Sequence, residues 1–297
     1  MDAVYRAFKQ YSESIQLPVE SLLSDMLDYA RLYEKLLTCR SGLKESALDD
    51  CLFRMSRLEI TVARPFFMEV LRLQKEGKIS IPDLLKVFLT TESFLFRRNI
   101  CDVPTNSLNK LFVNLNREII RFENNADNYL QKFVYALRAK KESVRFPDDE
   151  EFNQALANKQ VYLMRGRYKQ YMFERFENGG TREIKQFYEQ LDQRVYTIEH
   201  IMPQHLRQEW IDALGKDAAK IHEEWLHRLA NLTLTAYNPE LSDRPFAEKR
   251  DTEEYGYKNS GLRMNQKIAQ KEAWGLAELE ERNREMIQKA DEIWACP

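Results

Sequence analysis

A histidine beside an acidic residue is the clearest sign of chemistry in this sequence, where residues 199–203 read Glu-His-Ile-Met-Pro. Histidine is the side chain best suited to take a proton from water near neutral pH, so His200 is a candidate general base. Residues 194–198 are rich in β-branched and aromatic side chains, which predicts a strand. Because neighbouring side chains of a strand point to opposite faces, Glu199 and His200 can share one task only if the backbone bends. Pro203 is consistent with such a bend.

Two amide side chains and two cations follow this histidine in an order that suits phosphodiester hydrolysis. Asn231 opens a second predicted strand at residues 232–235, and Asn238 lies in the turn after it. Lys249 and Arg250 fall on the helix that is predicted next. Hydrolysis assisted by a metal ion needs a base for water and a divalent cation that neutralises the developing charge. Carboxylate and amide oxygens suit Mg²⁺, so these residues predict a metal-assisted nuclease.

Three motifs, taken in order, resemble the C-terminal nuclease domain of GmrSD-type modification-dependent restriction enzymes. They are Glu-His-Ile-x-Pro-Gln at 199–204, Asn-Leu-Thr-Leu-Thr-x-x-Asn at 231–238 and Pro-Phe-x-x-Lys at 245–249. The domain in that family is an HNH-like (His-Me finger) nuclease with an HxxP signature. The motif match covers roughly residues 150–294, and residues 20–125 are similar to the helical region that precedes the nuclease in the family.

The resemblance implies a role for each residue that matches these motifs. His200 would be the general base, and Asn231 would brace the loop that carries it. Glu199 and Asn238 would hold one divalent metal ion, Mg²⁺ or Mn²⁺, in an embedded ββα-metal finger. Lys249 would contact a phosphate of the substrate.

Two arginines are further candidates for contact with the DNA backbone. Arg250 neighbours the lysine of the third motif, and Arg167 lies in the basic and aromatic run 165–169. Arginine side chains make many of the phosphate contacts that position a protein on DNA. These residues therefore predict contact with substrate phosphates.

The three other histidines carry weaker signals. His205 lies close to the motif at residues 199–203, so a functional role for it stays open. His222 and His227 are five residues apart, which is off the i, i+4 spacing of zinc-binding pairs on a helix. Both are therefore predicted to be surface or interface residues.

The biological role implied by the resemblance is the restriction of foreign DNA, in particular modified phage DNA. Full-length relatives carry an N-terminal ParB-like domain that is associated with nucleotide hydrolysis and with sensing the modification. No Walker-type glycine loop is found in this sequence, so nucleotide binding is not assigned to it. The ParB-like sensor is expected as a missing domain or as a separate subunit.

Two other functions stay open. The interval from Asn231 to Asn238 is shorter than in many HNH nucleases. This would suit a helical DNA-sensing or assembly module whose nuclease site is degenerate. The same finger would also serve an RNA-cleaving nuclease.

The composition favours a mainly helical protein, with only nine glycines and nine prolines in 297 residues. The net charge of −2 means that a nucleic-acid surface must be a local patch. The four cysteines form no CxxC pair, which favours the reduced thiols of a cytoplasmic protein. No signal peptide opens the sequence, and no apolar run approaches the roughly 20 residues that span a bilayer, so no membrane partner is expected.

The hydrophobic periodicity predicts a helical bundle at residues 1–142 and a helical nuclease module at 143–297. The bundle would serve as a scaffold that links the sensor to the nuclease, and the module would contain the ββα-metal finger. Helices are predicted over 19–39, 47–74, 82–95, 107–123, 129–140, 154–177 and 272–294, with another starting near 243. Pro65 should kink the second helix or begin a new one.

Overall fold

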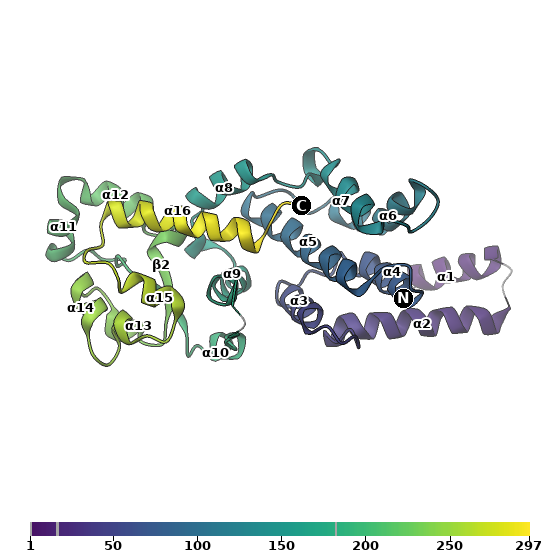
Figure 1. Ribbon diagram of the computed structural model, residues 1–297, viewed down its shortest axis with the longest axis horizontal. Coiled ribbons are helices and arrows are strands. Elements are labelled where there is room, and N and C mark those ends of the chain that lie inside the picture. The colour runs from purple at the N-terminus through teal and green to yellow at the C-terminus, as the bar shows by residue number, and fades with distance from the viewer. Residues whose placement is uncertain (1, 16–17, 182) are drawn as a thin grey trace. The chain divides into compact units, whose positions relative to one another are not determined.

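The computed structural model describes residues 2–15, 18–181 and 183–297, and this part of the chain is mainly helical (Figure 1). The mainly α fold class predicted from the composition is therefore confirmed. Within the described residues, the sheet has two strands. Among these residues, no helix combines the length and the apolar character needed to cross a membrane.

The chain divides into two compact units. The N-terminal unit takes in the chain up to Leu89 together with residues 106–139, and the C-terminal unit takes in residues 90–105 and 140–297. The sequence division at 142/143 assigned residues 90–105 to the helical bundle, whereas their contacts group them with the C-terminal unit.

Among the described residues, seven helices lie wholly or partly in the N-terminal unit, and several aromatic side chains are part of its core. They are α1 (Asp2–Ile15), α2 (Val19–Thr38), α3 (Ser46–Arg57), α4 (Arg64–Lys75), α5 (Ile81–Ile100), α6 (Leu108–Arg121) and α7 (Tyr129–Arg138). Pro65 lies in the first turn of α4, so it begins a new helix, where its missing N–H costs nothing. Next to it, Phe66 stacks on Phe133 with ring centroids 5.6 Å apart, which joins α4 to α7.

The two strands of the C-terminal unit lie among helices, most of which are short. The elements are η1 (Glu142–Val144), α8 (Asp149–Asn158), η2 (Val161–Leu163), α9 (Gly166–Asn178), α10 (Tyr188–Asp192), β1 (Thr197–His200), α11 (Gln208–Leu214), η3 (Gly215–Asp217), α12 (Ala218–Trp225), η4 (Leu229–Asn231), β2 (Leu232–Thr235), α13 (Asn238–Leu241), α14 (Phe246–Asp251), η5 (Tyr257–Asn259), α15 (Arg263–Ile268) and α16 (Leu276–Ile293). The single helix predicted over 154–177 is thus two helices, α8 and α9, separated by η2.

The two strands pair antiparallel, with His200 opposite Leu232 and Thr197 opposite Thr235. The second strand lies where the sequence predicts it, whereas the first begins three residues later than predicted. Arg194 has a φ of 58° and closes the turn after α10, so the chain becomes extended only beyond it.

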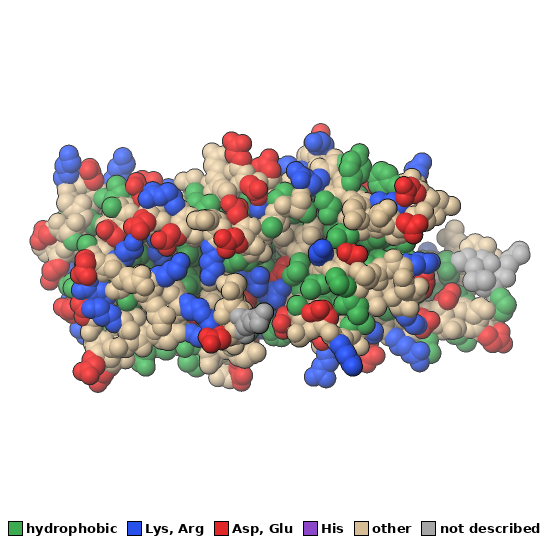
Figure 2. All heavy atoms as spheres, viewed as in Figure 1, with side chains coloured by type: hydrophobic (Ala, Val, Ile, Leu, Met, Phe, Trp, Pro, Cys, Tyr) green, Lys and Arg blue, Asp and Glu red, His purple; other side chains and the backbone are tan. Residues whose placement is uncertain are grey.

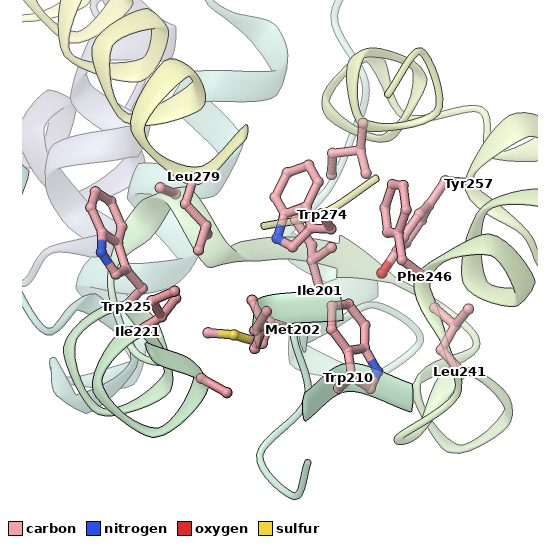
Figure 3. Packing of buried hydrophobic residues seen from close by; sticks show 14 residues of the cluster. Ile201, Met202, Trp210, Ile221, Trp225, Leu241, Phe246, Tyr257, Trp274 and Leu279 are labelled. Carbon is pink, nitrogen blue, oxygen red and sulfur yellow. The ribbon is translucent and has the colours of Figure 1, made fainter. Parts of the chain in front are cut away.

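The residues that follow β1 are buried in the core of the C-terminal unit. Ile201 and Met202 are fully buried in an apolar cluster that includes three tryptophans, Trp210, Trp225 and Trp274 (Figure 3). Burying a large apolar side chain contributes about 1.5–3 kcal/mol. This packing fixes the end of β1, and with it the position of His200.

The end of α16 explains why residues 90–105 belong to this unit. Trp294 is buried, stacks on Phe96 at 4.2 Å and donates a hydrogen bond from Nε1 to the Tyr171 hydroxyl at 2.8 Å. Arg97, also buried, donates from Nε to the Trp294 carbonyl at 2.5 Å. The second half of α5 is therefore tied to the C-terminus of the chain through both ring packing and hydrogen bonds.

Candidate histidine site and its comparison with known families

His200 ends β1 and lies in a small group of rings. Its side chain is only 5% exposed, and its Nε2 lies 3.2 Å from Nδ1 of His227. The Tyr162 ring lies 4.4 Å from the His200 ring and stacks on His227 at 5.2 Å. The prediction that His227 is a surface or interface residue misses this contact, because His227 is partly buried against the candidate base.

The surroundings of His200 hold its imidazole in the neutral form. Burial, together with the nearby His227 and Lys249, lowers the pKa of His200 to about 3. Burial also lowers the pKa of His227. A neutral imidazole has one nitrogen with a free lone pair, which is what a group needs in order to take a proton from water.

Asn231 braces the loop that follows His200. Its side chain is fully buried, its Oδ1 accepts a hydrogen bond from the Met202 N–H at 2.8 Å, and its Nδ2 donates to the Met202 carbonyl at 2.8 Å. Nδ2 also donates to the Leu226 carbonyl, and Trp274 Nε1 lies 3.3 Å from Oδ1. The Asn231 carbonyl accepts from the Ile201 N–H at 2.9 Å. One asparagine thus fixes both backbone polar groups of Met202, in the geometry expected of a brace.

Glu199, one residue before the histidine, takes part in a buried ion pair. The residue is 2% exposed, and its carboxylate accepts a hydrogen bond from Lys249 Nζ at 2.6 Å. Lys249 is fully buried and also donates to the His200 carbonyl at 2.9 Å. Burial raises the pKa of Glu199 and lowers that of Lys249, and each shift is opposed by the charge of the partner. Lys249, predicted to contact phosphate, is instead engaged inside the protein.

Asn238, the other predicted metal ligand, begins α13 and faces β1. Its Nδ2 donates to the Ile198 carbonyl at 2.8 Å and to Thr197 Oγ1 at 3.1 Å. With both amide protons used, Oδ1 remains available as an acceptor. The amide therefore links α13 to the first strand.

The oxygen donors of Glu199 and Asn238 suit Mg²⁺ or Mn²⁺ by their chemistry. Their arrangement does not fit such an ion, because the Lys249 ammonium already holds the Glu199 carboxylate. Within the part of the chain that the structure describes, no three His, Cys, Asp or Glu side chains converge on a common point.

The two arginines predicted to contact DNA lie in different surroundings. Arg250 pairs with Asp251 at 2.7 Å and with Glu272 at 2.8 Å, so its guanidinium is bound by two carboxylates of the protein itself. Arg167 is partly buried in the first turn of α9. Two residues further, Lys169 Nζ lies 4.7 Å from the Tyr162 ring, which connects this helix to the histidine site.

Residues 146–289 match the family model described as GmrSD restriction endonucleases, C-terminal domain. This part of the chain belongs to that family. The match lies within the C-terminal unit and contains both His200 and Asn231, so the resemblance drawn from three short motifs is confirmed. The family is one of restriction endonucleases, which implies that this GmrSD domain is a nuclease module. No curated protein matches the chain.

Two members of the ring group in the GmrSD domain are missed by sequence reasoning. His227 and Tyr162 lie 27 and 38 residues from His200 in the chain, and their contacts depend on tertiary folding. No local motif marks a histidine that meets another histidine across such a distance. The scarcity of histidine, with four in 297 residues, is the one sequence signal that would have singled out His227.

Proposed function

We propose that the GmrSD domain hydrolyses DNA phosphodiesters, with His200 as the general base. The observation that carries this proposal is the His200 imidazole itself, held neutral at the end of β1 on a loop that Asn231 braces. The biological role proposed with it is the restriction of modified phage DNA, guided by a ParB-like, nucleotide-hydrolysing sensor. The ββα finger formed by β1, β2 and the following helix is part of the same proposal.

In the proposed reaction, a nitrogen of His200 accepts a proton from water as the oxygen attacks phosphorus. The new O–P bond forms while the P–O bond to the leaving oxygen breaks, and solvent supplies the proton that this oxygen takes up. A positioned base contributes about 10²–10⁴-fold to the rate of such a step. The apolar packing of Ile201 and Met202 supports this role because it keeps the ring in one place.

The resemblance implies that cleavage requires a divalent metal ion, and this requirement can be tested separately. In the geometry described above, an ion at Glu199 would have to replace the Lys249 ammonium. The proposed proton transfer therefore uses His200 and water alone.

A cavity in the C-terminal unit offers side chains that suit a nucleic-acid strand. On the face shown in Figure 2, Lys and Arg side chains are interspersed with Asp and Glu, which agrees with the net charge of −2. A cavity of about 790 Å³ in the C-terminal unit is lined by Arg165 and Tyr168, and also by Gln160 and Leu163. The last two flank Tyr162 in the chain, and arginine with tyrosine offers phosphate contact and stacking.

The proposal is tested by cleavage of a supercoiled plasmid, with and without the modification carried by phage DNA, in Mg²⁺ or Mn²⁺ and in EDTA. His200→Ala should slow cleavage by about 10²–10⁴-fold. His205→Ala is the matched control, because His205 is exposed, and it should cleave like the wild type. Equal cleavage by wild type and His200→Ala, or no cleavage by either protein with any metal, would contradict the mechanism. Full activity in EDTA would contradict the metal requirement.

A second candidate function is a DNA-sensing or assembly module with a degenerate nuclease site. The ion pair between Glu199 and Lys249 favours it, because the pair closes the place where a metal ligand is expected. DNA binding by a wild-type protein that cleaves neither DNA nor RNA would support this alternative. Competition between duplex DNA and tRNA separates DNA cleavage from RNA cleavage.

A further inference from the structure

We propose that His227 is a positioning residue whose Nδ1 accepts the Nε2 proton of His200. This contact would fix one tautomer of His200, with the lone pair on Nδ1 free to act on water. The inference rests on the proposed function, in which His200 is the base. It adds a residue that none of the sequence motifs contains.

The distance and the chemistry of the two rings support a hydrogen bond. His200 Nε2 and His227 Nδ1 are 3.2 Å apart, and the two rings are inclined by 63°. Two neutral imidazoles can share only one proton between these nitrogens, so one ring donates and the other accepts. The geometry alone allows either direction.

The role of His200 as base decides the direction. If His200 Nε2 accepted a proton from His227, Nδ1 would carry the ring proton and no lone pair of His200 would be free to act on water, so the ring proton must be on Nε2. Nε2 then donates to His227 Nδ1, and His227 carries its own proton on Nε2. When His200 Nδ1 gains the proton from water, the same hydrogen bond becomes charge-assisted and therefore stronger. The contact thus stabilises the protonated base formed during the reaction.

His227 is itself held by several contacts, which a positioning residue requires. The Tyr162 N–H donates to the His227 carbonyl at 3.1 Å, and the two rings stack at 5.2 Å with an interplanar angle of 13°. Lys169 Nζ donates to the Tyr162 carbonyl at 2.6 Å. A ring held from its backbone and from its face has little freedom to leave His200.

His222 supports the same region through a separate contact. Its Nε2 lies 2.9 Å from the Pro203 carbonyl, on the loop that follows His200. It therefore provides a comparison within the site, because it lies near the loop yet does not hydrogen-bond His200 itself.

The first test uses side chains that replace one nitrogen of His227 at a time. In His227→Asn, the amide oxygen stands close to the place of Nδ1, so it can accept the His200 proton. In His227→Gln, the longer side chain reaches toward the place of Nε2, and in His227→Phe the acceptor is lost while the ring remains. We expect His227→Asn to cleave plasmid within about 3-fold of wild type, and Gln and Phe to lose about 10–100-fold, as for other partners that orient a histidine.

The outcomes separate this inference from the proposed function. If His200→Ala abolishes cleavage but His227→Phe cleaves like wild type, His227 has no positioning role and the nuclease proposal stands. If His200→Ala cleaves normally, the proposed function fails first. Equal losses in Asn, Gln and Phe would overturn the inference, because they would indicate a structural role alone.

The second test reads the tautomer directly, in the full chain, by ¹⁵N NMR of the imidazoles. With only four histidines, each signal can be assigned from single substitutions, including the control His222→Gln. We expect His200 to be protonated at Nε2 in the wild type and in His227→Asn, and to become a mixture of tautomers in His227→Phe. A wild-type His200 protonated at Nδ1 would overturn the proposed direction. Stoichiometric Zn²⁺ binding that is lost in His227→Asn would replace the hydrogen bond by a metal bridge.

Discussion

The two faces of β1 differ sharply, although they are reached by neighbouring residues. On one face, the His200 ring contacts the rings of His227 and Tyr162. The side chains of His227 and Tyr162 are partly exposed to solvent. On the other, Glu199 and Lys249 form an ion pair closed off from solvent. Solvent thus reaches part of the first face, whereas the second face is closed to it.

An acidic residue next to a histidine in the sequence therefore need not lie beside that histidine in the fold. Strand alternation sends the Glu199 and His200 side chains to opposite sides. The bend expected from Pro203 comes after both residues, so it does not bring the carboxylate to the ring.

The largest effect is expected from Lys249→Met, which breaks the closed face. It leaves the Glu199 carboxylate buried without its cation, so the free energy of unfolding should fall by roughly 3–5 kcal/mol. Chemical denaturation measures this loss. The double variant Glu199→Gln with Lys249→Met removes both charges and should recover much of the stability and still cleave DNA. A double variant as unstable as Lys249→Met would refute a structural role for the pair.

A smaller loss of stability is expected from Asn231→Ala, which removes the brace beneath both faces. The N–H and carbonyl of Met202 would be left buried without this partner, so the free energy of unfolding should fall by about 2 kcal/mol. Asn158→Ala is the control, because this asparagine is exposed and its substitution should change stability by less than about 0.5 kcal/mol. Thermal unfolding compares them, and equal melting temperatures would count against the brace.

The smallest effect is expected from substitutions of Tyr162, which act on the open face alone. Tyr162→Leu removes the ring that contacts both His200 and His227, and cleavage should fall by about 10-fold as the pair loses its fixed geometry. Tyr162→Phe keeps the ring and should cleave like wild type. Plasmid cleavage at equal folded fraction gives the comparison, and a Leu variant as active as Phe would show that stacking is dispensable.

The fold was predictable where local pattern governs it. The strand 232–235 and the new helix at Pro65 follow from alternation and from proline geometry. The first strand starts late because Arg194 takes a left-handed conformation, which a β-rich local sequence does not reveal. The hydrophobic periodicity did not predict the division of 154–177 into α8 and α9, because helical spacing continues through the interruption at η2.

By itself, the sequence determined the family, the histidine at the end of a strand and the asparagine that braces its loop. These depend on residues that are close in the chain or fixed in a recognisable order. Only the tertiary structure decided which groups meet them: His227 and Tyr162 on one face of β1, and Lys249 closed over Glu199 on the other. Such contacts join residues tens of positions apart, and burial rather than local pattern selects them, because a charge or imidazole removed from water is stable only beside a matching partner.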